Sequence, residues 1–402
     1  MLDAIDWWYN YVFHSEGNVS EVIEALKLQP PHLCSITFER TCNLQCAHCI
    51  YQAEKSSRHE SDRAGLCDIV QGLVNQIPSE NGSPTLLHEG RILRPWHIES
   101  LRKAREQRPN LKIGLIDNGT YLNLINQFRD LKLDWIDISI DGTEQVHNLQ
   151  RRNNHAWQQA QLGLRRAREV VKPAQEGGAV NTLFTVSELN YHNVSAAIDS
   201  VLGGSEPLAD GMDVITMSPS RTELKPLEIT AEHFAEFWQQ LKQAAALYNR
   251  DEFKVFFRIY YLPDLVKLSQ VVGRVRLMSV LRDQRKTDED YLLGVETGRI
   301  TFMIDGVLVT YYPISISVQE TFLVDADGQY RLPYSISYTL EELRRGVSGS
   351  GNDIEAYTVA QLNRDSSLTK MYNLGVDQWW QHFGQYYLAN EKAALSGAAE
   401  HP

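Results

Sequence analysis

Three of the five cysteines in this sequence of 402 residues lie within eight consecutive positions, as Cys42, Cys46 and Cys49. Three thiolates in one loop can bind three irons of a four-iron, four-sulfur cube and leave the fourth iron with an open coordination site. Sites of the ferredoxin type use four cysteines, so the missing fourth ligand favours a cluster whose open iron binds a substrate or cofactor. A zinc site of these cysteines and His48 is the alternative, but the adjacent residues His48 and Cys49 converge poorly on one ion.

The other two cysteines fit packing positions. Cys34 lies in the apolar stretch 33–38, and Cys67 lies on an apolar face with helical spacing. A low, odd number of cysteines argues against a disulfide scaffold and for a reducing compartment. The first 13 residues include two aspartates and no basic region, so we predict no signal peptide and a cytoplasmic location.

The composition is that of an ordinary globular protein, with 43% hydrophobic and 22% charged residues. Lys and Arg total 39 and Asp and Glu total 51, which gives a net charge of −12. This acidic balance provides no electrostatic surface for nucleic acid or an anionic membrane. No apolar run approaches the roughly 20 residues of a membrane-spanning helix, so we expect neither partner.

Segments with strand patterning alternate with helical segments between residues 33 and 217. This alternation implies right-handed βαβ units and a parallel sheet. Eight units would close a TIM barrel, whereas six leave it open along one side unless other segments cover the gap. The expected fold is therefore α/β, a partial (β/α)6 TIM-like barrel. The predicted strands are Leu33–Phe38, Pro84–His88, Leu111–Ile116, Asp134–Ile140, Ala179–Val186 and Met212–Met217.

The alternation stops after Pro219. Thr230 can cap a long helix over Ala231–Tyr248, and the stretch Arg299–Tyr312 has a hairpin pattern with Asp305-Gly306 at its turn. These features predict a C-terminal α+β extension, and the resemblance given below implies that it covers the open barrel and shapes the substrate pocket. The expected organisation is an N-terminal helical segment over 1–30, a barrel core over 31–222 and the extension over 223–402.

The residues of the core resemble the radical S-adenosylmethionine (SAM) superfamily, whose signature is CxxxCxxC after the first strand. His48 stands where an aromatic residue often precedes the last cysteine. The resemblance runs from about Leu33 to Pro219. The supporting motifs are Asn118-Gly119-Thr120 after the third strand, Ser139-Ile140-Asp141-Gly142 after the fourth, His147 with Arg151 at the spacing of members that modify peptides and natural products, and Asn190 after the fifth strand.

The resemblance implies one [4Fe–4S] cluster on Cys42, Cys46 and Cys49, with SAM bound at its open iron. An external reductant of the flavodoxin or ferredoxin type would supply an electron that cleaves SAM. The 5′-deoxyadenosyl radical so formed would abstract hydrogen from a peptide or small-metabolite substrate in specialised metabolism. The expected SAM-binding residues are Glu89, Asn118, Ser139, Asp141, Arg151 and Tyr51.

Several of these roles have structural alternatives. Asn118 and Asp141 are also typical turn formers, Arg152 can replace Arg151, and His147 can cap a helix. The family's Gly-Gly-Glu-Pro motif is degraded to Leu-His-Glu-Gly, in which Glu89 alone survives. This degradation leaves a second hypothesis, in which the same fold is a non-catalytic iron–sulfur scaffold or binding protein.

The C-terminal extension differs from that of peptide-modifying relatives, which often carries auxiliary iron–sulfur clusters. Residues Gly294–Pro313 resemble the hairpin of such an extension, but the expected cysteines are absent from it. We therefore expect a metal-free extension. A lack of an auxiliary electron acceptor favours reactions without net oxidation, such as epimerisation or rearrangement.

Overall fold

The computed structural model describes most of the chain between residues 94 and 312 and shorter segments on either side. The described residues are 33–36, 42–49, 67, 70–71, 74, 85–89, 94–120, 129–217, 222–250, 252–260, 262–281, 287–296, 299–312, 321–324, 330–331 and 337–338. The chain forms two compact units. One unit comprises Pro31–Ile229 with Glu320–Ile354, and the other comprises Met1–Pro30, Thr230–Gln319 and Glu355–Pro402.

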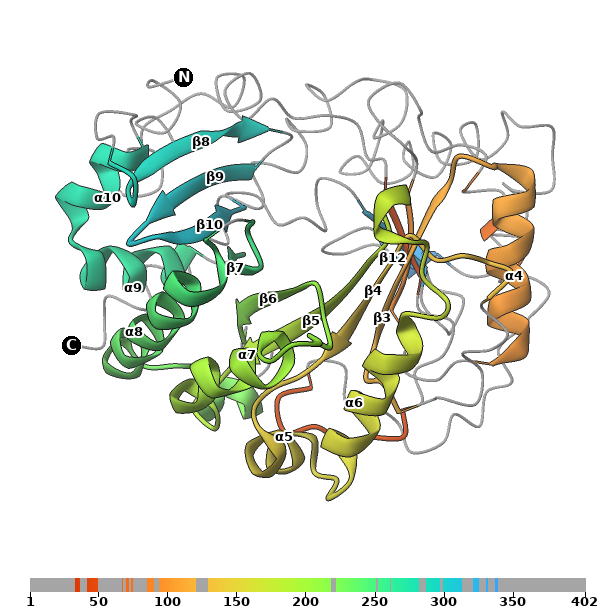
Figure 1. Ribbon diagram of the computed structural model, residues 1–402, viewed down its shortest axis with the longest axis horizontal. Coiled ribbons are helices and arrows are strands. Elements are labelled where there is room, and N and C mark those ends of the chain that lie inside the picture. Colours follow the sequence, from red (N-terminus) through yellow and green to blue (C-terminus); the bar gives the residue numbers. More distant parts are fainter. Residues whose placement is uncertain are drawn as a thin grey trace. The chain divides into compact units, whose positions relative to one another are not determined.

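The first of these units contains a mostly parallel sheet (Figure 1), as the alternating pattern predicts. Its strands β1 to β6 are neighbours in sequence order and parallel wherever their register is described. The predicted α/β fold is confirmed. These strands are β1 (Leu33–Ile36), β2 (Thr85–Glu89), β3 (Lys112–Asp117), β4 (Trp135–Ser139), β5 (Ala179–Val186) and β6 (Gly211–Thr216).

A strand from the C-terminal region pairs with β1, at the edge of this sheet. β11 (Thr321–Val324) is parallel to β1, and β12 (Tyr330–Arg331) and β13 (Ser337–Tyr338) follow in antiparallel order. The strand patterning does not predict β11.

The domain boundaries at residues 222 and 223 stay a prediction. Glu320–Ile354 shares a compact unit with the barrel strands.

Helices lie between the strands, as the alternating pattern predicts. They are α4 (Pro95–Gln107), α5 (Glu144–Arg151), α6 (Ala156–Ala167) and α7 (Val194–Leu202), with short 3-10 turns at Ala174–Glu176, Tyr191–Asn193 and Thr222–Leu227. Among them, α5 is a further helix that this pattern does not predict. Figure 1 shows α6 lying along β4, with which it is in contact. The side chains of Leu86, Ile113, Ile136, Val180 and Met212, one from each of five neighbouring strands, are at most 1% exposed. Burying each contributes roughly 1.5–3 kcal/mol, which stabilises the packing of this sheet.

In its described residues, the second unit combines four strands with three helices. In it β7 is parallel to β10, while β10–β9 and β9–β8 are antiparallel. The predicted hairpin is confirmed, because Asp305 and Gly306 have φ angles of 54° and 72° that suit a two-residue turn. The Thr230 side chain accepts a bond from the His233 amide, as an N-cap does. The elements are α8 (Ala231–Tyr248), β7 (Val255–Ile259), α9 (Leu262–Val272), α10 (Arg274–Leu281), β8 (Tyr291–Glu296), β9 (Arg299–Ile304) and β10 (Val307–Tyr311).

Within the described ranges, none of the helices combines the length and the apolar character that crossing a membrane requires.

Candidate iron–sulfur and SAM site

The predicted site residues follow neighbouring strands at one edge of the parallel sheet. Asn118 comes directly after β3, Ser139 ends β4, and Asp141 lies two residues further on. Glu89 ends β2, opposite Ile116 of β3. The carboxyl ends of parallel strands share one edge, which is where sites in β/α barrels lie.

Two of the predicted residues have no described side chain. Only the backbone of Glu89 is described, and Tyr51 lies outside the described residues. Ser139 is partly exposed at the strand end, in register with Leu183 of β5. The proposed roles of these three residues stay predictions.

The cysteine loop lies against α5. The Ala47 amide donates to the Gln150 carbonyl at 2.8 Å, and the Cys49 amide donates to the Cys46 carbonyl at 3.3 Å. Burial raises the pKa of the Cys42 and Cys46 thiols, and the neighbouring cysteines raise it further. The backbone contact with Gln150 therefore holds the middle of the cysteine loop against α5.

At the β3 end, the Cys42 sulfur accepts bonds from neutral donors. The Leu44 amide approaches it at 3.4 Å and the Asn118 side-chain amide at 3.7 Å. The same Asn118 amide donates to Asn43 Oδ1 at 3.0 Å, and the Asn43 amide donates in turn to the Thr120 hydroxyl. The turn after β3 thus contacts the start of the cysteine loop.

Two glycines make this turn compact. Gly119 has a φ of +75°, a conformation that favours glycine, and its amide donates to Asp117 Oδ1 at 2.7 Å. A β-carbon at Gly163 in α6 would lie 2.7 Å from the Gly119 carbonyl oxygen, so only glycine lets the helix approach so closely. The close contact fixes the turn that carries Asn118.

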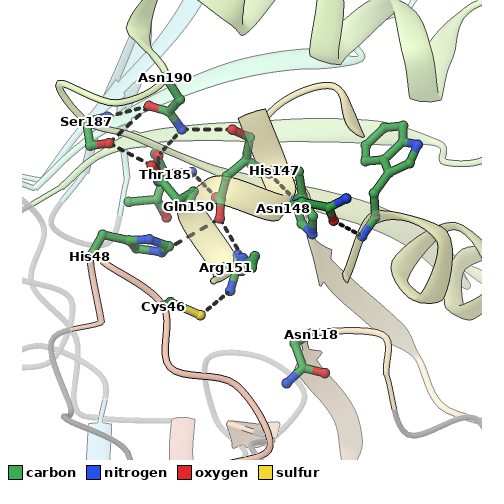
Figure 2. Close-up of polar contacts among 12 residues, drawn as sticks. Cys46, His48, Asn118, His147, Asn148, Gln150, Arg151, Thr185, Ser187 and Asn190 are labelled. Carbon is green, nitrogen blue, oxygen red and sulfur yellow. Dashed lines mark hydrogen bonds and ion pairs between the residues drawn. The ribbon is translucent and has the colours of Figure 1, made fainter. Parts of the chain in front are cut away.

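At the β4 end, a charged pair contacts the second cysteine (Figure 2). The Arg151 Nε lies 2.6 Å from Asp141 Oδ2, and the Arg151 Nη1 donates to the Cys46 sulfur at 3.6 Å. The first contact is an ion pair whose atoms are not aligned as a hydrogen bond. His48 Nε2 approaches the same carboxylate oxygen at 3.7 Å. Asp141 therefore contacts the cysteine loop directly at His48, and it contacts Arg151 of α5, which reaches Cys46 of the same loop.

The backbone and side chain of Asp141 are fixed by further bonds. The Thr185 amide donates to Asp141 Oδ1 at 3.1 Å, and the Asn190 side chain donates to the Asp141 carbonyl at 2.9 Å. The Asp141 amide donates to Nδ1 of His147 at 3.0 Å, so His147 accepts a bond from the turn before its helix. Gln150 extends this network by accepting from the Ser187 hydroxyl at 2.9 Å.

Burial and neighbouring charges shift the pKa values at the β4 end. Burial lowers the pKa of His48 to about 4 and that of His147 to about 3, so both rings are neutral at pH 7. Burial opposes ionisation of Asp141, but the Arg151 guanidinium, the two histidines and the Thr185 amide together outweigh it and lower the pKa of that carboxyl. Arg151 and Asp141 therefore form a charged pair in the interior.

A further carboxyl group lies at the β3 end. Burial raises the pKa of Asp117 to about 7, although the Gly119 and Asn118 amides favour its ionised form. Its Oδ2 is buried without a hydrogen-bond partner. Asp117 is not among the predicted site residues. The sequence signal that could have found it is an acidic residue at the end of β3, directly before Asn118.

The donor set suits a cubane better than a single ion. Within the described ranges, no three Cys, His, Asp or Glu side chains form a group that could hold one metal ion. A cubane binds each thiolate at a different iron, so its ligands need not converge on one point. Thiols whose pKa is raised by burial lose their protons when iron binds, and the cationic Arg151 offsets part of the resulting negative charge. The chemistry of the donor set is therefore compatible with a [4Fe–4S] cluster, and the three-cysteine ligand set stays a prediction.

Comparisons with known proteins agree with the motifs. No protein-family model matches the chain. Over 164 residues it is 27% identical to the Fe-coproporphyrin III synthase of Methanosarcina barkeri, a match that covers 40% of this chain and 38% of that protein. The match thus spans well under half the length of this curated relative.

Two solved structures have a similar fold. The first is anSMEcpe with bound AdoMet and the Cp18Cys peptide, at a TM-score of 0.51 and 15% identity, covering 88% of both chains. The second is Streptococcus suis SuiB bound to the precursor peptide SuiA, at a TM-score of 0.51 and 9% identity, covering 79% of this chain and 64% of that one. The chain shares the fold of these two structures. These likenesses agree with the resemblance read from the motifs, and Asn118 and Asp141 lie at the carboxyl edge of the sheet, where sites in β/α barrels lie.

Proposed function

We propose that this protein is a radical SAM enzyme that binds one [4Fe–4S] cluster through Cys42, Cys46 and Cys49. One observation supports the proposal: two sulfurs of the cysteine loop accept N–H donors, Cys42 from Asn118 directly after β3 and Cys46 from Arg151 of α5. When bound, such a cluster with SAM supplies one-electron cleavage of the sulfonium, and the 5′-deoxyadenosyl radical abstracts hydrogen from the substrate.

The described residues have distinct parts in this proposal. Asn118 holds the start of the cysteine loop, and the Arg151–Asp141 pair holds its middle. The SAM contacts that we propose come from Ser139, which is partly exposed at the strand end, and from Glu89 and Tyr51. The buried network around Asp141 excludes water from the back of the site, which protects a reactive radical.

The substrate class that we propose is a peptide or a small metabolite. Two proteins of similar fold are described with bound peptides, which supports the peptide. The Methanosarcina relative is named for a tetrapyrrole product, which supports a small metabolite. The electron donor that we propose is an external flavodoxin or ferredoxin, and the reducing cytoplasm would keep both cluster and thiols intact.

The decisive test is anaerobic reconstitution with iron and sulfide, followed by reaction with SAM and dithionite. We expect about four irons and four sulfides per chain and formation of 5′-deoxyadenosine. Cys46→Ala should abolish this product, whereas Cys67→Ala, which removes a cysteine outside the cluster motif, should retain it. Cleavage of SAM by Cys46→Ala at the native rate with an intact cluster would refute the ligand assignment.

The same assay separates the alternatives. A stable cluster that never cleaves SAM would indicate a non-catalytic iron–sulfur scaffold, and stoichiometric zinc without sulfide would indicate a zinc-stabilised module. For the substrate, deuterium-labelled peptides and carboxylated metabolites are compared. Transfer of deuterium into 5′-deoxyadenosine identifies the class that is attacked, and no transfer from any peptide would contradict the peptide proposal.

A further inference from the structure

We propose that Arg151 is a positioning residue that raises the reduction potential of the cluster by donating to the Cys46 sulfur, and that Asp141 holds it there. This inference rests on the proposed function, because it requires a cluster on the three cysteines. It assigns Arg151 a role toward the cluster in place of the predicted role toward the SAM carboxylate.

The two ends of the guanidinium have different partners. Nε faces Asp141 at 2.6 Å, while Nη1 faces the Cys46 sulfur at 3.6 Å. Planar guanidinium grips a carboxylate best with two parallel N–H groups of its fork. Here the guanidinium instead divides its N–H groups between the Asp141 carboxylate and the Cys46 sulfur, and Figure 2 shows Arg151 directed at Cys46.

The position of Arg151 is fixed from behind. Asp141 is fully buried and accepts from the Thr185 amide, and the Arg151 side chain is only 9% exposed. Arg151 also belongs to α5, whose Gln150 carbonyl accepts from Ala47 in the cysteine loop. The backbone bond between Ala47 and Gln150 therefore adds to the Arg151–Cys46 contact in holding the guanidinium near the sulfur.

The sign of the effect follows from charge. Reduction adds one electron, supplied by the external reductant, and no proton to the cluster, so the reduced form is more negative. A buried cation beside a ligand sulfur stabilises the more negative form, and hydrogen bonds to cluster sulfurs are among the factors that set the potential. Arg151 should therefore make the cluster easier to reduce.

The neighbouring Arg152 offers a matched control. It is exposed and ends α5 in a left-handed conformation with a φ of 52°. Arg151→Gln and Arg152→Gln remove the same charge one residue apart. They differ in that the first charge contacts Asp141 and Cys46.

The experiment is a redox titration of the reconstituted cluster, followed by electron paramagnetic resonance in the absence of SAM. We expect a more negative midpoint potential in Arg151→Gln, a smaller fall in Arg151→Lys, and the wild-type value in Arg152→Gln. If Arg151→Gln retains no cluster, Arg151→Lys is the deciding variant, because Lys keeps the charge and loses the fork. A wild-type potential in the deciding variant would overturn the inference.

Binding of SAM, measured in parallel, separates the two roles of Arg151. Weaker SAM binding with an unchanged potential would assign Arg151 to the SAM carboxylate and refute our inference while leaving the proposed function intact. A wild-type protein that assembles no cluster would instead refute the proposed function itself.

Discussion

The two ends of the cysteine loop are held in contrasting ways. At the β3 end, Cys42 receives neutral N–H donors, and the turn is kept compact by glycines. At the β4 end, Cys46 contacts a buried ion pair that is tied to β5. The Cys42 sulfur is thus positioned by backbone shape and the Cys46 sulfur by charge, so the two ends of the loop should respond differently to substitution.

The largest effect is expected from breaking the charged end. Asp141→Asn leaves Arg151 buried without its counter-charge, and removing one partner of a buried pair costs about 3–5 kcal/mol. Urea unfolding of the apoprotein measures this change. Glu169→Gln breaks the exposed pair with Arg129 and should cost less than about 1 kcal/mol. Equal losses in both variants would show that the β4 end is no more dependent on charge than the surface.

The β3 end should show its own pH dependence through Asp117. The pKa of this carboxyl is about 7 in the folded chain against 3.8 as its ordinary value, so the folded state binds more protons between these pH values. Stability should therefore fall as pH rises from 4 to 7, by up to about 1.4 kcal/mol per pH unit. Asp117→Asn should remove this slope and the exposed Asp130→Asn should keep it. A slope that persists in Asp117→Asn would assign it to another group.

Overpacking tests the shape of the β3 turn. Gly163→Ala places a β-carbon 2.7 Å from the Gly119 carbonyl oxygen and should destabilise the apoprotein by about 1–3 kcal/mol. Gln158→Ala, at an exposed position of the same helix, should change stability by less than about 0.5 kcal/mol. Thermal unfolding of the two variants decides, and an unchanged midpoint in Gly163→Ala would mean that α6 can retreat from the turn.

The smallest effect is expected from the neutral donor. Asn118→Ala removes its bond to Asn43 and should cost about 1 kcal/mol. In the reconstituted protein it should also lower the cluster potential by less than Arg151→Gln does, because it removes no charge. A larger shift in Asn118→Ala than in Arg151→Gln would reverse our comparison of the two ends.

The sequence predicts much of this arrangement because the strands have strong local patterns. β5 and α8 begin and end as predicted, and the Asp305-Gly306 turn follows from residues that accept positive φ angles. Spacing marks the three cysteines, and position after a strand marks Asn118 and Asp141. These features depend on neighbours in sequence, which periodicity and motifs describe well.

The remainder depends on contacts between distant segments. β11 pairs with β1 nearly 300 positions away, and no local pattern signals that edge. The contact between Gly163 and Gly119 depends on helix packing, and the pairing of Arg151 with Cys46 spans 105 positions. A motif indicates that an arginine belongs to a site but does not specify which group it contacts.

The most direct test of the whole account is the spectrum of the reduced, reconstituted protein before and after SAM is added. An open iron predicts a [4Fe–4S] signal by electron paramagnetic resonance that changes when SAM binds. A [4Fe–4S] signal that SAM leaves unchanged at saturating concentration, or a chain that binds zinc in place of iron and sulfide, would contradict it.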